Sequence, residues 1–218
     1  VYKRQAGKSA AQQLARLAET MHRIRRDCPW DAEQTHRSLV KHLIEETAEV
    51  VEVIESDGQG AIDDADLIEE LGDVLLQVFF HSEIAAQQGR FNIADVAAGV
   101  SDKLERRHPW VFAGQDNPED MMGAWEAAKQ AEKQRESALD GIPEPLPTLA
   151  RANKVVSRAR HVHLPVPMAD EPIDAQTVGE QILTLVQRAQ ASGIDADQAT
   201  RDAVRNLEAA IRDAESRA

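Results

Sequence analysis

One stretch decides the fold of this chain: Leu67-Ile68-Glu69-Glu70-Leu71-Gly72-Asp73-Val74-Leu75-Leu76-Gln77-Val78-Phe79-Phe80. Its apolar residues recur every three or four positions, which is the spacing of one face of an α-helix. After Asp73 they occupy nearly every side, and a helix that is apolar all round is buried. The stretch therefore predicts a buried helix, which we place at residues 63–88, ending at Gly89.

Two carboxylates lie on this predicted helix, at the edge of its apolar part. Glu70 and Asp73 are three residues apart, so their side chains share one side of the helix. From Glu45 to Asp73 the chain has twelve Asp or Glu residues and no Lys or Arg. An ionised carboxylate beside an apolar region is costly without a partner. Such an acidic block is either a solvated surface or a cation site.

A second helix is predicted just before this one, at residues 35–55. Its apolar stripe, which we expect to meet the core, consists of Leu39, Leu43, Thr47, Val50 and Ile54. Glu46 and Glu49 lie three residues apart beside that stripe and can converge on one point. A short connection makes the two helices antiparallel neighbours, which sets this pair opposite Glu70 and Asp73.

The carboxylates that are predicted to converge would repel one another, and a hard divalent cation relieves this repulsion. The ligand set consists of oxygen donors alone, which favours Mg²⁺ or Mn²⁺ over zinc or iron. Mg²⁺ is commonly shared between a few carboxylates and the phosphates of a substrate. The alternative, an exposed acidic face without a bound ion, stays open at this point.

The rest of the chain also has helical spacing, so the predicted fold class is all-α. Aromatic residues make up only 4% of the chain, and β-branched runs are short. Thr35 or Ser38 can cap the helix that begins near them, and Asn92 can cap a later one. Residues 27–31, which contain Pro29, are interpreted as a loop. Further helices are expected at 9–26, 92–107, 118–137, 148–161, 176–192 and 195–217.

The end of the chain looks like a degenerate repeat of an earlier part. Residues 179–210 can be laid over residues 72–107 with a gap of four positions. The second copy lacks the basic residues Lys103 and Arg107, and nothing in it resembles the acidic cluster. Chance similarity between two amphipathic helix pairs is the alternative.

Charge and composition exclude several function classes. The net charge of −13 argues against binding a nucleic-acid polymer, because phosphate contacts need a basic face. No apolar run approaches the roughly 20 residues that a membrane-spanning helix needs. Residues 1–8 are expected to be a disordered segment without a signal-peptide pattern. A single cysteine, Cys28, suits a reducing cytoplasm, which is the compartment we expect.

A basic group stands out against this acidic background, at the end of the predicted helix 92–107. It consists of Lys103, Arg106 and Arg107, which we regard as candidate substrate-binding residues. Phosphate oxygens that a metal leaves uncovered need donors of this kind. Cations also favour the C-terminal end of any helix, so that alternative stays open.

Two tryptophans are candidates for contact with a base. Trp125 and Lys129 lie four residues apart on a predicted helix, so a ring and an ammonium can face one ligand. An indole stacks on any base with little discrimination, although core packing explains a tryptophan equally well. Trp30, beside Pro29, is either a packing anchor or a second base contact.

Three histidines, His22, His36 and His108, each follow a glutamate by three residues. Such pairs on core helices are typical of di-iron carboxylate bundles. None of the three lies on the two helices that carry the converging carboxylates. We therefore interpret them as surface or capping residues and rank a di-iron protein last.

Five motifs occur in order along the chain. They are Cys28-Pro29-Trp30-Asp31, Gln34-Thr35-His36, Glu45-Glu46-x-x-Glu49, Glu70-Leu71-Gly72-Asp73 and Asp102-Lys103-Leu104-Glu105-Arg106-Arg107-His108-Pro109. Together they resemble the MazG family of nucleoside triphosphate pyrophosphohydrolases over residues 12–140. The resemblance implies an all-α fold, a tight dimer or higher oligomer, and Mg²⁺-dependent release of pyrophosphate. It implies that the metal is bound by Glu46, Glu49, Glu70 and Asp73. The nucleotide contacts that it implies are Lys103, Arg107, Trp125 and Lys129.

We therefore expect a MazG-like catalytic domain at residues 9–140, a Pro-rich linker at 141–148 and a degenerate second module at 149–218. Family members often carry two modules, and the resemblance alone does not say which copy is active. The intact carboxylates assign the activity to the first module. The expected function is hydrolysis of nucleoside triphosphates for nucleotide-pool cleansing, by a homodimer without a membrane or nucleic-acid partner.

In the expected mechanism a water attacks the α-phosphorus in line, and Mg²⁺ lowers the pKa of that water. Lys103 and Arg107 stabilise the departing pyrophosphate. Glu45 or Glu46 takes the proton from the water, and the sequence does not say which. The main alternative is a non-catalytic acidic helical module that serves oligomerisation or metal binding.

Overall fold

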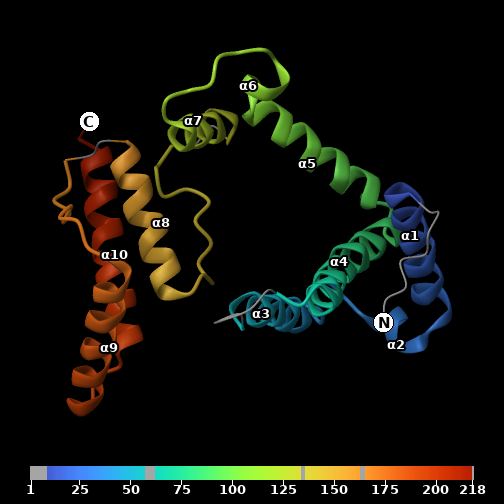
Figure 1. The fold of residues 1–218 in the computed structure, drawn as a ribbon, viewed down its shortest axis with the longest axis horizontal. Coiled ribbons are helices and arrows are strands. Elements are labelled where there is room, and N and C mark those ends of the chain that lie inside the picture. The colour runs from blue at the N-terminus through green and yellow to red at the C-terminus, as the bar shows by residue number, and fades with distance from the viewer. Residues whose placement is uncertain (1–8, 57–61, 134–135, 163–164, 218) are drawn as a thin grey trace. The chain divides into compact units, whose positions relative to one another are not determined.

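The structure, a computed structural model, describes residues 9–56, 62–133, 136–162 and 165–217. The predicted disorder of residues 1–8 and the predicted helix end at residues 57–60 lie outside them. Within the described ranges the chain forms helices and no strands, which confirms the all-α prediction (Figure 1). Two compact units divide the chain, residues 1–106 and 107–218, and each is described by itself. Among the described helices, none combines the length and the apolar character that crossing a membrane requires.

The first unit is built around the helix that the quoted stretch predicts. Its described helices are α1 (Ala10–Asp27), α2 (Pro29–Glu33), α3 (Val40–Glu55), α4 (Asp64–Gln87) and α5 (Ile93–Arg107), whose last residue begins the second unit. Helix α4 packs against both α1 and α3, and α2 folds back against α1. The longest helix is thus the central one of this unit.

The core of the first unit lies where α1 meets the second half of α4. Its buried side chains are Met21, Leu39, Phe79, Phe80 and Ile84. The predicted burial of the apolar end of α4 is therefore confirmed. By contrast, α3 has no buried residue, so its predicted core stripe is wrong except at Leu39, which precedes the helix. Within this unit α3 packs mainly against α4, which leaves most of its apolar side chains in water.

Several helix ends agree with the sequence and one does not. The side chain of Asn92 accepts a bond of 2.7 Å from a backbone N–H in the first turn of α5, as predicted. Helix α4 ends before Gly89, whose φ of 66° favours glycine. The N-cap of α3 is Leu39, so neither predicted hydroxyl occupies that position. Instead Thr35 and Ser38 bond each other's backbone N–H through their side chains and close the preceding turn.

The predicted loop at residues 27–31 is wrong, because most of it belongs to the short helix α2. Pro29 is the first residue of that helix, where its missing N–H costs nothing and its fixed φ suits the helix. A second short helix, α6 (Pro109–Phe112), begins with proline in the same way. At Pro29 the proline thus starts a helical turn that was predicted to be a loop, while α5 ends at Arg107, before Pro109, as predicted.

The second unit contains α6, α7 (Met121–Lys133), α8 (Thr148–His161), α9 (Ala175–Ala191) and α10 (Ala196–Glu215). Helix α10 packs against both α8 and α9 (Figure 1). Helix α8 has the predicted bounds. The buried core side chains of this unit are Leu139, Ile142, Val155, Ala159, Val204 and Ile211.

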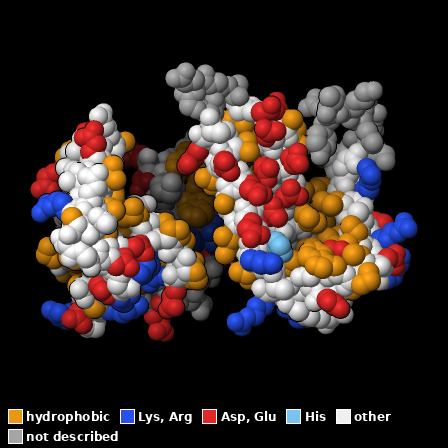
Figure 2. Space-filling view, turned by 90° about the horizontal axis from the view of Figure 1, so that it is seen from below, with side chains coloured by type: hydrophobic (Ala, Val, Ile, Leu, Met, Phe, Trp, Pro, Cys, Tyr) orange, Lys and Arg blue, Asp and Glu red, His pale blue; other side chains and the backbone are white. Residues whose placement is uncertain are grey.

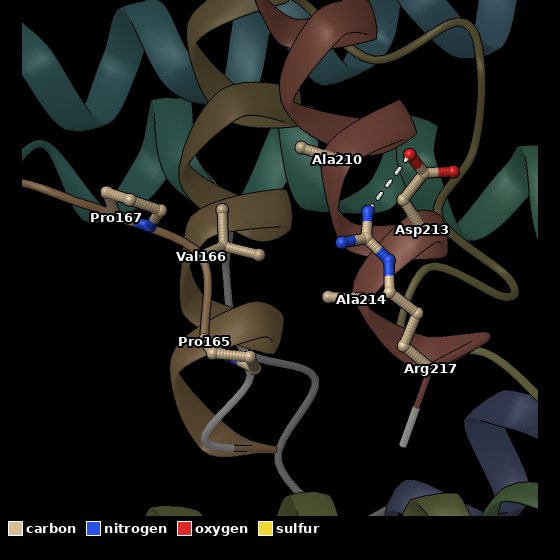
Figure 3. Close-up of a pocket in the computed structure, with 7 residues that line it drawn as sticks. All are labelled: Pro165, Val166, Pro167, Ala210, Asp213, Ala214 and Arg217. Carbon is tan, nitrogen blue, oxygen red and sulfur yellow. Dashed lines mark hydrogen bonds and ion pairs between the residues drawn. The ribbon is translucent and has the colours of Figure 1, made fainter.

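The chain after α8 lies beside α10. Pro165, Val166 and Pro167 form one wall of a shallow pocket of about 360 Å³, and α10 forms the other (Figure 3). On the α10 side, Arg217 pairs with Asp213 at 3.4 Å. Val166 also packs against the core, so this segment is an integral part of the unit.

Helix α9 differs from its neighbours in the second unit because it has no buried residue. Its exposed apolar side chains are Val178, Ile182, Leu183, Leu185 and Val186. It is therefore held to the unit mainly by its contact with α10.

Candidate metal centre and nucleotide contacts

Three of the four carboxylates that the sequence singled out come together between α3 and α4. Glu46 and Glu49 project from α3 and Glu70 from α4, and one ligand oxygen from each lies within 4.8 Å of the other two. Glu46 and Glu70 are half-buried, whereas Glu49 is exposed. Figure 2 shows acidic side chains gathered over α3 on the surface. The predicted convergence is thus present for these three residues.

Asp73, the fourth candidate, lies at the edge of this group. It is half-buried, and its charge acts on both Glu46 and Glu70, but it is not one of the three residues with closely spaced oxygens. Among the neighbouring charges, that of Asp73 raises the pKa of Glu46 most, and that of Glu49 raises the pKa of Glu70 most. The earlier carboxylate of α3 therefore lies nearer the later one of α4, and the later one of α3 nearer the earlier one of α4. This is the antiparallel arrangement that the sequence predicted.

Burial and mutual repulsion change the acidity of this cluster. Partial burial, followed by the charges of Asp73 and Glu49, raises the pKa of Glu46 above its ordinary value. Partial burial, followed by the charges of Glu49 and Asp73, likewise raises the pKa of Glu70. Both shifts have the sign expected where like charges are close and uncompensated. In the part of the chain that the structure describes, no ion pair joins these carboxylates to Lys or Arg.

The donor set suits a hard divalent cation. Carboxylate oxygens are the ligands that Mg²⁺ and Mn²⁺ prefer, and neither soft sulfur nor imidazole nitrogen belongs to the group. The raised pKa values indicate negative charge that the protein itself does not neutralise. Glu46, Glu49 and Glu70 could therefore hold such an ion.

Glu45, a candidate proton acceptor, stands apart from the three converging carboxylates. Its carboxylate lies 3.1 Å from Nδ1 of His42, one turn earlier on α3. The ring of His42 in turn makes an edge contact with Trp30, with centroids 6.3 Å apart. Sequence reasoning missed His42, although its position three residues before Glu45 on the same helix was a usable signal.

The predicted basic group has unequal surroundings. Lys103 is half-buried and Arg106 is exposed, both on α5. Arg107 is buried, and its guanidinium donates to Glu132 through Nε at 2.9 Å and Nη2 at 2.7 Å. This pairing could not be predicted from local spacing, because Glu132 lies 25 residues further along the chain.

Trp125, in the second unit, is close to two cations. The guanidinium carbon of Arg107 lies 5.2 Å from its ring centroid, and Nζ of Lys129 lies 4.8 Å from it. These distances are within the range of cation–π attraction. The expected neighbourhood of Trp125 and Lys129 is therefore present, with Arg107 added to it.

The histidines divide into two kinds. Nδ1 of His22 lies 2.8 Å from Oε1 of Glu83, in an exposed position that agrees with the interpretation of His22 as a surface residue. His36 is different, because its Nδ1 lies 2.8 Å from Nδ1 of His81 and the two rings stack with centroids 5.1 Å apart. Nε2 of His36 also contacts Arg90. His36 is half-buried, and the interpretation as a surface or capping residue did not anticipate this contact with a residue 45 positions away.

Known proteins share the region that contains the acidic cluster. The family profile described as the MazG nucleotide pyrophosphohydrolase domain matches residues 34–112. An Escherichia coli K12 protein named nucleoside triphosphate pyrophosphohydrolase is 43% identical over 158 residues, or 69% of this chain and 58% of that protein. A protein of the same name from Mycobacterium tuberculosis is 41% identical over 174 residues, or 78% of this chain and 52% of that protein.

A third relative is similar over nearly the whole chain. An uncharacterized 26.1 kDa protein of Streptomyces cacaoi is 42% identical over 209 residues, or 93% of this chain and 82% of that protein. The chain thus spans between about half and three fifths of the two named enzymes and most of this third relative. The profile match includes the carboxylates of α3 and α4. By these similarities the chain belongs to the MazG family of nucleotide pyrophosphohydrolases.

Proposed function

We propose that this chain hydrolyses nucleoside triphosphates to nucleoside monophosphates and pyrophosphate, with Mg²⁺ or Mn²⁺ as the cofactor. The observation that carries the proposal is the approach of Glu46, Glu49 and Glu70, whose ligand oxygens lie within 4.8 Å of one another. Relatives that are named nucleoside triphosphate pyrophosphohydrolase support the same reaction. The biological role that we infer is cleansing of the nucleotide pool.

The converging carboxylates would hold the cation, and Asp73 adds negative charge that attracts it. When bound, the ion neutralises charge on the phosphates and lowers the pKa of a water. The protein's part is to keep the carboxylates close together despite their repulsion, which the packing of α3 against α4 achieves. Substrate phosphates can approach because Glu49 is exposed and its two partners are only half-buried.

Glu45 is our candidate for the proton acceptor, in preference to Glu46. Glu46 belongs to the group that would bind the ion, whereas Glu45 is exposed and bonded only to His42 among the contacts described above. A carboxylate that is held in place but not engaged by a cation can take a proton from the attacking water. In this scheme His42 is a positioning residue that orients Glu45.

The remaining contacts would serve the substrate. Lys103 and Arg106 are the proposed donors to the phosphate oxygens, since guanidinium and ammonium groups bind such oxygens well. Arg107, Trp125 and Lys129 form the proposed nucleotide contact of the second unit. Trp30, which is 57% exposed, remains a candidate base contact.

We further propose that the chain acts as a homodimer in the cytoplasm. Apolar side chains on α3 and α4 stay in water in the single chain, among them Ile44, Val51, Ile54, Ile68 and Leu71. Exposed apolar patches of this kind are typical of protein interfaces. A second copy of the chain that packs against these side chains would cover the apolar face of α3, which the first unit leaves exposed to water.

The test is an assay of the purified chain with all common NTPs and dNTPs in the presence of Mg²⁺. Pyrophosphate should accumulate, orthophosphate should not, and EDTA should stop the reaction. Glu46→Gln should abolish turnover, whereas Glu52→Gln should keep it, because Glu52 is an exposed acid on α3 outside the cluster. An inert wild-type chain would favour the non-catalytic alternative, and a fully active Glu46→Gln variant would refute the metal centre.

A further inference from the structure

A pocket in the second unit is lined by arginines from two helices. Arg151 of α8 and Arg201 and Arg205 of α10 line it, together with Thr148 and two glutamates. Its volume is about 370 Å³, within the range of roughly 300–1,000 Å³ that is usual for small-ligand sites. None of the described residues that line it belongs to the acidic cluster or to the proposed nucleotide contacts.

The helical spacing of α10 turns this basic surface toward α8. Arg201, Arg205 and Glu208 are four and then three residues apart, so they share one face of the helix. Glu208 accepts bonds from Arg151, from Nε at 2.9 Å and from Nη2 at 2.7 Å. Nη1 of Arg151 donates to the carbonyl of Pro143 at 2.9 Å. One guanidinium is therefore held in place before any ligand arrives, which lowers the cost of binding.

The other two guanidiniums are paired only at the surface. Arg201 pairs with Asp197 and Arg205 with Asp202, and these four side chains are between 41% and 58% exposed. Exposed ion pairs stabilise a protein little, so these arginines can turn toward a stronger anion at low cost. A guanidinium also has five N–H donors, so it can bind such an anion and keep its aspartate.

The start of α8 adds positive charge to the same pocket. Thr148 is the first residue of that helix, and the preceding Pro147 gives the first turn no side-chain cap. The first N–H groups of a helix carry partial positive charge and favour anions. Guanidiniums match phosphate oxygens in geometry, and a single carboxylate has too few oxygens for three of them. The pocket therefore suits a ligand with several phosphate oxygens.

We propose that this pocket binds a diphosphate group, either as inorganic pyrophosphate or as the diphosphate of a nucleotide such as ADP. A diphosphate offers enough charged oxygens for the arginines of both helices. The proposal goes beyond the proposed function and does not depend on it, because the pocket contains none of the residues that we assign to that reaction.

The test is calorimetric titration of the purified chain with pyrophosphate in buffer that contains EDTA, so that no divalent cation links phosphates to the acidic cluster. Arg201→Ala and Arg205→Ala should each weaken binding about 10-fold, because each removes charge-assisted bonds. Arg205→Lys should weaken it less, because it keeps the charge and loses only the fork. Arg217→Ala is the matched control, because it also removes an arginine that pairs with an aspartate four residues away on α10, outside this pocket.

Two further titrations locate the ligand and identify its source. In a Lys103→Ala/Arg106→Ala background, which lacks the proposed phosphate donors of the first unit, pyrophosphate should still bind. ADP that binds more tightly than pyrophosphate would identify a nucleotide as the source, and pyrophosphate that binds as tightly or more tightly would identify the free anion. The proposal is overturned if neither binds the wild type, if Arg217→Ala weakens binding as much as Arg205→Ala, or if that background abolishes binding.

Discussion

Helices α3 and α4 of the first unit and helix α10 of the second are all rich in acidic residues, but they accommodate the charge in opposite ways. On α10 each of four carboxylates is paired with an arginine, in the pairs Arg151–Glu208, Arg201–Asp197, Arg205–Asp202 and Arg217–Asp213. On α3 and α4 the carboxylates of Glu46, Glu49 and Glu70 lie close together, and burial and repulsion raise the pKa of Glu46 and Glu70. The paired acids of α10 are neutralised within the protein, whereas the cluster of α3 and α4 is not, which supports the cation site proposed above.

Helices α4 and α9 end in similar backbone conformations. Gly89 follows α4 with φ of 66°, and Gly193 follows α9 with φ of 69°. After each glycine the next N–H donates back to the helix, from Arg90 to Ala85 and from Ile194 to Ala189. Glycine ends of this kind are common to many helices, so the predicted repeat stays a prediction together with the domain bounds. If the repeat is genuine, its second copy has kept the helix packing and lost the acidic cluster.

The largest expected difference between the two regions is in turnover, when one carboxylate is neutralised in each. Glu70→Gln should lower kcat/KM for ATP hydrolysis roughly 1,000-fold, because it removes a member of the proposed metal centre. Asp202→Asn, which neutralises an arginine-paired acid on α10, should leave kcat/KM unchanged. Equal losses in the two variants would show that general acidity, and not the cluster, matters for turnover.

A second prediction concerns the free energy of unfolding. It should fall when a paired carboxylate of α10 is removed and rise when a carboxylate of the acidic cluster is neutralised. Glu208 is buried and pairs with Arg151 at 2.7 Å, so Glu208→Ala should lower the free energy of unfolding by roughly 3 kcal/mol. Glu46→Gln should raise it in metal-free buffer, because it removes a charge that its neighbours repel. Urea titrations followed by circular dichroism measure both. Destabilisation by Glu46→Gln without metal would contradict the idea of uncompensated charge.

Added Mg²⁺ should also change the Tm of variants in the two regions to different extents. At ten times its dissociation constant the ion should stabilise the wild type by about 1.4 kcal/mol, seen as a higher Tm. Glu70→Gln should lose this response, while Glu208→Gln should keep it even though its starting Tm is lower. A Tm that rises equally in all three proteins would indicate general ionic screening.

The smallest expected effect is a pH dependence of the free energy of unfolding, which arises from a histidine pair outside the acidic cluster. Burial, and then the neighbouring His36, lowers the pKa of His81 below its ordinary value of 6.5. The unfolded chain therefore binds this proton more readily, so the stabilisation is complete above pH 6.5 and declines as the pH falls below it. His81→Asn should flatten that decline below pH 6.5, as measured by urea unfolding. An unchanged slope would exclude the histidine pair as its source.

The sequence predicted the helices and the carboxylates well because both depend on short-range spacing. Residues three or four apart on one helix share a face whatever the rest of the chain does, which is why Glu46 with Glu49 and the cap at Asn92 could be anticipated. The bounds of α8 followed from a proline-rich segment on one side and a second break on the other.

The features that the sequence could not predict depend on contacts between residues far apart along the chain, or on contacts that this chain does not supply. The contact between His36 and His81 and the bond between Arg107 and Glu132 join residues 45 and 25 positions apart. The exposure of the α3 stripe has another cause, because periodicity indicates which face is apolar but not what covers it. The prediction at Pro29 was wrong because a proline can either start or stop a helix, and the local sequence does not distinguish the two.

The bare surface of α9 has a consequence for how the protein opens. A helix with no buried side chain gives up little when it separates from its neighbour, so its amide hydrogens should exchange long before those of α8 or α10. Gentle heating or a low dose of protease would then release the segment around residues 175–191 first, while α3 and α4 keep their carboxylates together. The tail would fray in a molecule whose acidic cluster is still intact.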